Sequence, residues 1–94
     1  MTIYLSGKIT GDPEYKAKFE AAARELEKQG HTVLNPAALP SSGFEWSAYM
    51  RIAAAMLAEC EAVYFLTDWQ ESKGAMQERQ LALRLGKRIW GSGK

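Results

Sequence analysis

Four short runs rich in apolar residues alternate along this chain with three longer segments whose apolar residues recur at helical spacing. The runs lie at residues 2–6, 32–34, 62–66 and 88–90. The third run is unbroken, which is typical of a parallel strand that is covered on both faces. With right-handed crossovers, the alternation predicts an α/β fold with a four-stranded parallel sheet, a Rossmann- or flavodoxin-like three-layer sandwich. The expected strand order is 2-1-3-4.

Turn and cap residues indicate where the first two helices begin and end. Asp12 has the position of an N-cap, and Gly30 ends the apolar pattern that follows it. Ser42 and Glu45 have capping-box spacing, which predicts the start of the second helix. The chain between these helices, residues 35–45, is long and irregular. Loops of that length in a small domain are usually functional or act as lids.

The third helix carries one acidic residue among its apolar positions. Ser72 has the N-cap position, and Ala75, Ala82 and Leu85 follow at helical spacing. Glu78 lies three residues after Ala75 and four before Ala82, so it projects from the same apolar face. A carboxylate in that position must be paired with a cation, reach a cleft, or have a raised pKa.

Two interpretations of Glu78 remain open from the residues alone. The structural interpretation is an ion pair with a basic residue such as Arg51 or Lys8. The functional interpretation is a reactive carboxylate that lies below an anion site at the start of the same helix. The free amides of a first helical turn favour such an anion site.

The loops after the first and third strands are expected to share one crevice, because the order 2-1-3-4 places the topological switch point between these strands. The first of these loops, residues 7–11, contains two glycines and one lysine. Its spacing fits neither a Walker A loop nor a dinucleotide fingerprint, and a plain tight turn is the alternative. Together with the start of the third helix, it makes a cradle suited to one phosphate or a sugar. The candidate contacts are Ser6, Gly7, Lys8, Gly11, Ser72 and Gly74.

Aromatic residues near the same end of the sheet could stack on a base, although each of them taken singly is more often a core or surface packing residue. The two stacking candidates are Trp46 and Trp69, and Tyr4 and Phe44 lie nearby in the predicted fold. A crevice with one buried carboxylate, an anion site and stacking surfaces is suited to a small nucleotide or nucleoside.

Composition narrows the classes of partner. The chain has 94 residues, expected to form one domain over residues 1–94, and a formal charge of +1. That charge gives no reason to expect binding to a nucleic-acid polymer or a membrane, and no apolar run is long enough to span a bilayer. With only Cys60 and His31, we expect no disulfide framework, no metal and no cofactor, in a reducing cytoplasm. Residues 91–94 are expected to be a frayed tail.

Three stretches of the sequence carry a family resemblance. They are Ile-Tyr-Leu-Ser-Gly-Lys-Ile-Thr-Gly at residues 3–11, the turn Asn35-Pro36, and Ser-Lys-Gly-Ala-Met-Gln-Glu at residues 72–78. In this order they resemble the nucleoside 2-deoxyribosyltransferase superfamily, including its small members and the deoxynucleoside 5′-monophosphate N-glycosidases. The resemblance implies hydrolysis or transfer at an N-glycosidic bond, through a glutamate nucleophile and a covalent glycosyl-enzyme.

The resemblance also implies roles for individual residues. Glu78 matches the nucleophile of the family, and Tyr4 matches a tyrosine that helps to position it. Six residues before the glutamate, the nucleoside transferases have an acid that holds a free sugar hydroxyl. The nucleotide hydrolases have a serine there that binds the 5′-phosphate. This chain has Ser72, which implies a nucleoside 5′-monophosphate rather than a free nucleoside.

One departure from the family concerns the acid or base that serves the leaving group. Relatives carry an aspartate for this in the second helix, near Ala53, and this chain has no acid there. Either Asp68, Glu45 or Glu71 takes that role, with Asp68 as the first candidate, or the protein is a catalytically inactive module that binds or senses nucleotides.

The second helix also points to self-association. Residues 52–57 form one apolar run, although a helix that covers one face of a sheet needs only an apolar stripe. Members of the resembled superfamily assemble as dimers or multiples of dimers, so we expect a homodimer or a multiple of dimers. The remaining alternative is a protein-interaction domain whose aromatic loop, residues 39–49, contacts a partner.

Overall fold

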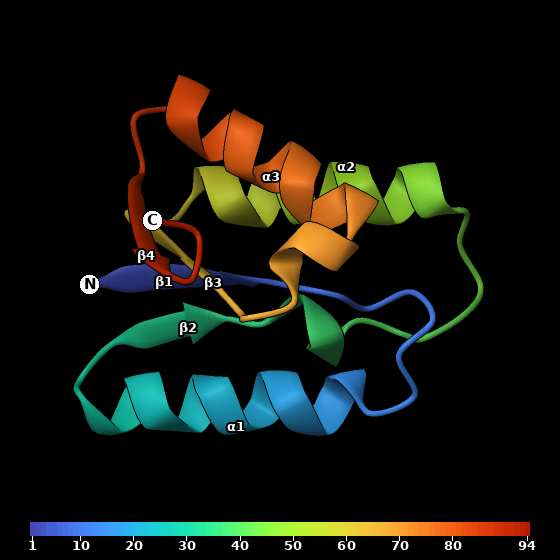
Figure 1. Cartoon of the computed structure of the whole chain (residues 1–94), viewed down its shortest axis with the longest axis horizontal. Coiled ribbons are helices and arrows are strands. Elements are labelled where there is room, and N and C mark those ends of the chain that lie inside the picture. The colour runs from blue at the N-terminus through green and yellow to red at the C-terminus, as the bar shows by residue number, and fades with distance from the viewer.

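The computed structural model describes residues 1–94, and its strands form one parallel sheet (Figure 1). The strands are β1 (Thr2–Ser6), β2 (Thr32–Leu34), β3 (Ala62–Phe65) and β4 (Arg88–Gly91). Their order in the sheet is β2-β1-β3-β4, and every neighbouring pair is parallel. The predicted fold class and strand order are therefore confirmed.

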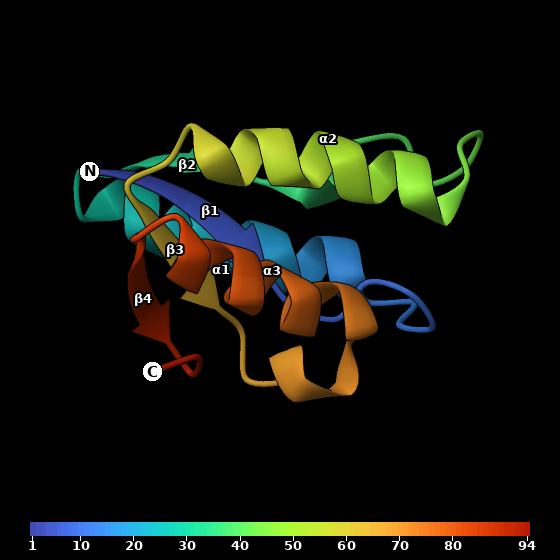
Figure 2. The same ribbon diagram turned by 90° about the horizontal axis from the view of Figure 1, so that it is seen from above.

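Helices cover both faces of this sheet. Helix α1 (Tyr15–Lys28) lies on one face, whereas α2 (Trp46–Ala58) and α3 (Lys73–Arg84) lie together on the other (Figures 1 and 2). Two short 3₁₀ turns, η1 (Pro36–Ala38) and η2 (Trp69–Glu71), follow β2 and β3. None of the helices has the length and apolar character needed to cross a membrane.

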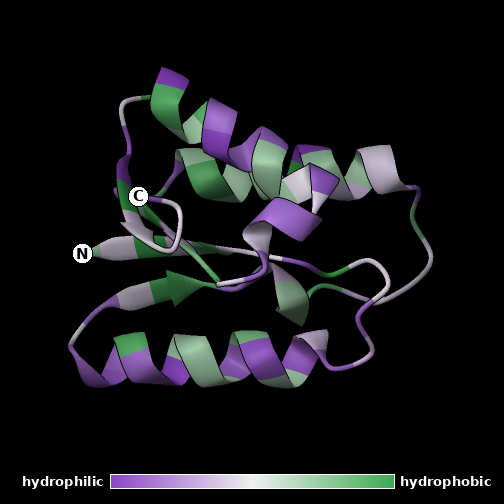
Figure 3. Cartoon of the chain, in the orientation of Figure 1, coloured by the Kyte–Doolittle hydropathy of each residue, from purple (hydrophilic) through white to green (hydrophobic).

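The alternation of side chains along β1 divides the core into two parts. Ile3 and Leu5 pack in a cluster with Phe19 and Leu26 of α1. Tyr4 belongs to the other cluster, together with residues of α2 and α3. Successive side chains of a strand point to opposite faces, so Ser6 shares the face of Tyr4. In Figure 3 hydrophilic and hydrophobic residues alternate along α1, which buries only one side.

Helix α1 begins later than the sequence predicted, because Asp12 forms a turn instead of a helix cap. One carboxylate oxygen of Asp12 accepts a hydrogen bond from the backbone N–H of Glu14 at 2.9 Å, and the other accepts one from Lys18. The residue that precedes the helix is Glu14, which makes no side-chain capping bond. The Asp12 carboxylate is therefore used to fix the loop before α1.

The predicted capping box of α2 is wrong. The helix begins at Trp46 after Glu45, and no side chain caps it. Gly43 has a φ of 108°, a left-handed conformation that turns the chain directly after Ser42 and prevents a helical turn there. The Ser72 cap of α3 is confirmed, since its hydroxyl accepts a hydrogen bond from the N–H of Ala75 at 3.0 Å.

The C-terminal residues, which were predicted to be frayed, are held against β3. The N–H of Ser92 donates to the carbonyl oxygen of Phe65 at 2.9 Å, and the carbonyl of Ser92 accepts from the Trp69 indole at 3.0 Å. The carbonyl of Gly93 accepts from Arg79 at 2.7 Å. Glycine is needed here because a side chain at position 93 would overlap the Phe65 ring. A glycine-rich tail looks flexible in a sequence, yet the same residues permit this close packing.

We expect alanine at Gly91 to destabilise the protein more than alanine at Gly86. Both glycines have a φ of 70°, a conformation that costs an L-residue about 1–2 kcal/mol. A Cβ at Gly86 meets nothing within 4 Å, whereas at Gly91 it would lie 2.5 Å from the Phe65 carbonyl oxygen. The clash should add about 1–3 kcal/mol, measured by urea unfolding of both variants. Equal losses at the two sites would contradict the packing of β4 against β3.

Candidate functional site

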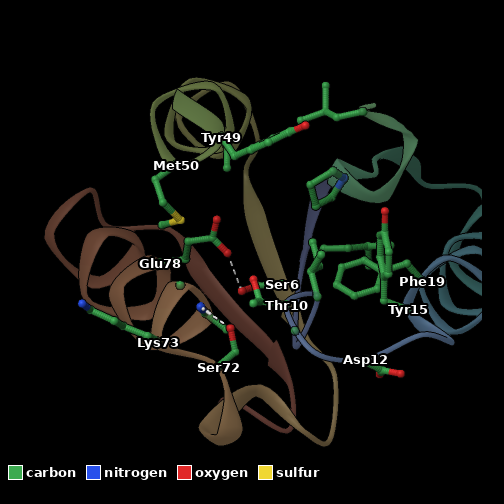
Figure 4. A pocket seen from close by; sticks show the side chains of 18 of the residues that line it. Ser6, Thr10, Asp12, Tyr15, Phe19, Tyr49, Met50, Ser72, Lys73 and Glu78 are labelled. Atoms are coloured by element: carbon green, nitrogen blue, oxygen red, sulfur yellow. Dashed lines mark hydrogen bonds between the residues drawn. The ribbon is translucent and has the colours of Figure 1, made fainter. Parts of the chain in front are cut away.

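The carboxylate of Glu78 is held by two hydroxyl groups of β1. The Tyr4 hydroxyl donates to Oε2 at 2.7 Å. The Ser6 hydroxyl donates to Oε1 at 2.7 Å, as Figure 4 shows. Glu78 is 7% exposed, and Tyr4 and Ser6 are each 1% exposed. Because Tyr4 and Ser6 are two residues apart in a strand, both point at the same turn of α3. Both carboxylate oxygens are therefore oriented before any ligand binds.

Of the two interpretations left open for Glu78, the structural ion pair does not form, since none of the ion pairs in the structure includes it. Lys8 pairs with Glu71 at 3.4 Å, and Arg51 is exposed. Burial raises the pKa of Glu78, and the hydrogen bonds from Ser6 and Tyr4 oppose this rise only in part. The pKa of the Tyr4 hydroxyl is also raised, first by burial and then by the charge of Glu78. The result is a buried carboxyl group with no cation beside it.

Glu78 lines a cleft of about 970 Å³. The cleft is bounded by the end of β1 and the loop that follows it, by the segment after β2, and by the first turns of α2 and α3. Figure 4 shows Glu78, Ser72 and Lys73 on one side and Tyr15, Phe19 and Asp12 on the other. Clefts of this size take small organic ligands, with apolar walls for binding and a few polar groups for orientation.

Most of the predicted contacts lie in this cleft. The start of α3 can approach α2 closely because residue 74 is glycine: a Cβ there would lie 3.2 Å from the sulfur of Met50. The predicted site residues that line the cleft are Tyr4, Ser6, Gly7, Gly11, Trp46, Ser72, Gly74 and Glu78.

The structure does not bring Lys8, Asp68 or Trp69 into the lining of the cleft. The carboxylate of Asp68 accepts the backbone N–H of Lys8 at 3.1 Å and pairs with Lys18. Trp69 packs edge-on against the Phe65 ring at a centroid distance of 5.5 Å, and it holds the C-terminal residues. Asp68 and Trp69 lie where the chain enters η2, and their partners lie on α1, on β3 and in the C-terminal residues.

Several residues of the cleft were not singled out from the sequence as site residues. Lys73 is the cation in the lining, and its ammonium lies 5.4 Å from the centroid of the Trp46 ring. Tyr15, Tyr49 and Met50 also line the cleft, although their spacing is that of ordinary core residues of a helix. The signal that could have identified them is their place in the first turns of helices that begin at the cleft.

Acidic residues in the cleft are few. Helix α2 contributes Trp46, Tyr49, Met50 and Ala53 to the lining and no acid. Of the three carboxylates that could replace the missing aspartate, only Glu71 lines the cleft. No group of three or more His, Cys, Asp or Glu side chains is placed to hold a metal ion. The carboxylates that line the cleft are therefore those of Asp12, Glu71 and Glu78.

The fold and the cleft define an α/β protein with a buried carboxylate at the switch point of a parallel sheet. The chain belongs to the family described as "Domain of unknown function (DUF4406)", whose model matches residues 1–90. No curated protein sequence matches the chain.

Two solved structures share the fold. A 2-deoxyribosyltransferase from Leishmania mexicana superposes with a TM-score of 0.72 at 18% identity, covering 94% of this chain and 61% of its own. A 2-deoxyribosyltransferase from Bacillus psychrosaccharolyticus superposes with a TM-score of 0.66 at 21% identity, covering 95% of this chain and 69% of its own. The chain thus spans 61% of the length of the first of these relatives. The resemblance noted in the sequence is confirmed at the level of the fold.

We expect Glu78→Gln to stabilise the protein at neutral pH and to lose this advantage in acid. Since the folded-state pKa of Glu78 is raised, the folded protein binds a proton more tightly than the unfolded chain. Its stability therefore falls as the pH rises from the unfolded to the folded pKa. Glutamine stays neutral, and it can accept from Tyr4 while donating to Ser6.

Thermal unfolding of both proteins between about pH 4 and about pH 8, a range that brackets the titration of ordinary carboxyl groups, measures this effect. Glu27→Gln on the exposed side of α1 is the control for the loss of one negative charge. A difference in Tm between Glu78→Gln and wild type that does not change with pH would contradict the expectation.

Proposed function

We propose that this protein breaks the N-glycosidic bond of a nucleoside 5′-monophosphate, by hydrolysis or transfer, with Glu78 as the nucleophile. The observation that carries the proposal is the Glu78 carboxylate, which is buried without a cation, oriented by two hydroxyl donors, and part of the lining of the cleft. The shared fold with two proteins named as 2-deoxyribosyltransferases supports it. Perturbed carboxyl groups in clefts are common at active sites.

The proposed reaction has two displacement steps. An oxygen of Glu78 attacks C1′ of the sugar, and the bond from C1′ to the base nitrogen breaks with its electron pair leaving on the base. Water or a second base then attacks C1′ and releases the carboxylate, so the configuration at C1′ is retained. Tyr4 and Ser6 act by holding the carboxylate in position, which removes the need to order it in the transition state.

The departing base needs a proton. In this proposal Glu71 supplies it, because Glu71 is the one of the three candidate carboxylates that lines the cleft. The absence of an acid on the α2 side favours a second candidate function. This is a module that binds or senses a nucleotide in the same cleft and does not cleave it.

The phosphate is proposed to lie at the start of α3. Ser72 and Gly74 line the cleft there, with Lys73 between them as the cation. The first amides of a helix have no partner within the helix and favour an anion. The glycine loop, with Gly7 and Gly11, is proposed to contact the sugar and phosphate, and Trp46 to stack on the base.

We further propose that the working form is a homodimer or a multiple of dimers. Large apolar side chains remain exposed on and near α2, with Phe44 at 57%, Trp46 at 44% and Ile52 at 38% exposure. Aromatic and aliphatic residues of this kind are typical of the centres of interfaces.

Glu78→Gln is expected to lower the rate of base release from a nucleoside 5′-monophosphate by more than about 1000-fold, as expected for loss of a nucleophile. Its Kd for the nucleotide should stay within about threefold, because size and hydrogen bonding are kept. Chromatographic detection of free base over a panel of nucleotides measures turnover, with Glu27→Gln as the control. Unchanged turnover in Glu78→Gln would rule out this nucleophile. Nucleotide binding without base release in the wild type would favour the second candidate function.

A nucleoside 5′-monophosphate is expected to raise the Tm more than its nucleoside, since only the nucleotide fills the anion site. Ser72→Asp should reverse this preference by like-charge repulsion. Ser72→Asn is the matched control, because asparagine also caps a helix but carries no charge. Thermal shift measurements of the three proteins with both ligands test this preference. Equal shifts in the wild type would count against a phosphate site at this position.

Light scattering at micromolar concentration is expected to give at least twice the chain mass of 10.5 kDa. Ile52→Glu places a charge on the exposed side of α2 and should shift the protein toward the monomer. Arg24→Glu, which changes an exposed residue of α1, is the control. A monomeric wild-type protein under these conditions would contradict the proposed dimer.

A further inference from the structure

A group of charged residues at the edge of the cleft joins the two loops that begin at the switch point. The ammonium of Lys18, on α1, donates to the carboxylate of Asp12 at 2.5 Å, to the carboxylate of Asp68, and to the backbone carbonyl of Lys8 at 3.2 Å. An ammonium has three N–H donors, so all of them are used. Lys8 and Asp12 belong to the loop after β1, and Asp68 belongs to the loop after β3.

Both carboxylates also accept hydrogen bonds from backbone N–H groups. Asp68 accepts the N–H of Lys8 at 3.1 Å through its second oxygen, and Asp12 accepts the N–H of Glu14 at 2.9 Å. Burial alone would lower the pKa of Lys18, but its bonds to Asp12 and Asp68 outweigh burial and raise that pKa. The hydrogen bond from Lys18 likewise lowers the pKa of Asp12. At neutral pH the group consists of one cation between two carboxylates.

The loop that this group holds is a wall of the cleft. Gly7, Ile9, Thr10, Gly11 and Asp12 all line the cleft, whereas Lys18 and Asp68 do not. A Cβ at Gly7 would lie 2.8 Å from Leu66 and 3.2 Å from the Asp68 carboxylate, so the two loops are in tight contact. A segment with two glycines has little conformational preference of its own, and contacts from outside the loop must fix its shape.

From this geometry we propose that Lys18 is a positioning residue, which fixes residues 7–12 against the loop after β3 and so sets the wall opposite α3. Its effect on substrate rests on the function proposed above, but its effect on the loop does not. Without the Lys18 ammonium, the carboxylates of Asp12 and Asp68 lose the cation that they share and repel each other. The wall then opens, and the ligand loses a preformed surface.

The test uses Lys18→Met, with Lys28→Met on the exposed end of the same helix as the matched control. Hydrogen exchange followed by mass spectrometry on the unliganded proteins should show residues 7–12 exchanging at least about tenfold faster in Lys18→Met only. Core strands β1 and β3 should keep their protection. Unchanged exchange at residues 7–12, or an equal increase over the whole chain, would overturn the positioning role.

A second variant separates charge repulsion from the loss of a side chain. In Lys18→Met/Asp68→Asn only one carboxylate remains, and the amide oxygen of the new residue can still accept the N–H of Lys8. This double variant should recover protection against hydrogen exchange at residues 7–12 relative to Lys18→Met. It also tests the proposal if the single variant folds poorly. Protection that is as low as in the single variant, or lower, would overturn the role of Lys18 as a shared cation.

The kinetic readout connects the loop to the ligand. Lys18→Met should raise KM for a nucleoside 5′-monophosphate about tenfold and change kcat less than about threefold, as expected for lost binding with Glu78 intact. Faster exchange with an unchanged KM would overturn the link to substrate binding. If the wild type neither binds nucleotides nor releases base, the proposed function fails, while the exchange measurements still decide the role of Lys18.

Discussion

The Glu78 carboxylate, buried without a cation, is the constraint on which the other features of the site depend. Burying a carboxyl group away from water costs free energy unless hydrogen bonds replace the bonds that it made to water. Tyr4 and Ser6 supply those bonds, and they can do so only if β1 lies at the centre of the sheet and α3 crosses above its end. The position of α3 therefore depends on the strand order. Glu78 remains accessible from the cleft in this arrangement.

Two different kinds of contact keep the cleft open on either side of Glu78. On the α3 side, close packing of Gly74 against Met50 sets the approach of two helices, and α2 contributes the apolar side chains of that wall. On the other side the wall is a glycine-containing loop, and charges do the same task through Lys18, Asp12 and Asp68. Rigid elements need only shape complementarity to keep their distance, whereas a flexible loop needs directional bonds. A site built in this way presents a preformed surface to its ligand.

The errors of the sequence interpretation share a physical origin. Lys8 and Asp68 were expected at the cleft, but Lys8 pairs with Glu71 after β3 and Asp68 pairs with Lys18 on α1. Ser42 has the spacing of a cap, but Gly43 turns the chain away from the helix. The C-terminal glycines looked flexible, yet they allow the chain to pack on the Phe65 ring. In each case a local pattern was correct as a propensity and was overridden by contacts with distant residues.

The sequence by itself determined the α/β class, the strand order and the inward position of Glu78, because hydrophobic periodicity and handed crossovers are expressed within one element or between successive ones. Only the tertiary structure decided which groups Glu78 meets, since Tyr4 and Glu78 are 74 residues apart along the chain. The tertiary structure also decided which lysine lines the cleft. Lys8 is bound by Glu71 in the neighbouring loop, whereas Lys73 has no carboxylate beside it and lies over Trp46. Which partner each of these lysines meets depends on distances between loops, and these distances cannot be predicted from the spacing of residues in the sequence.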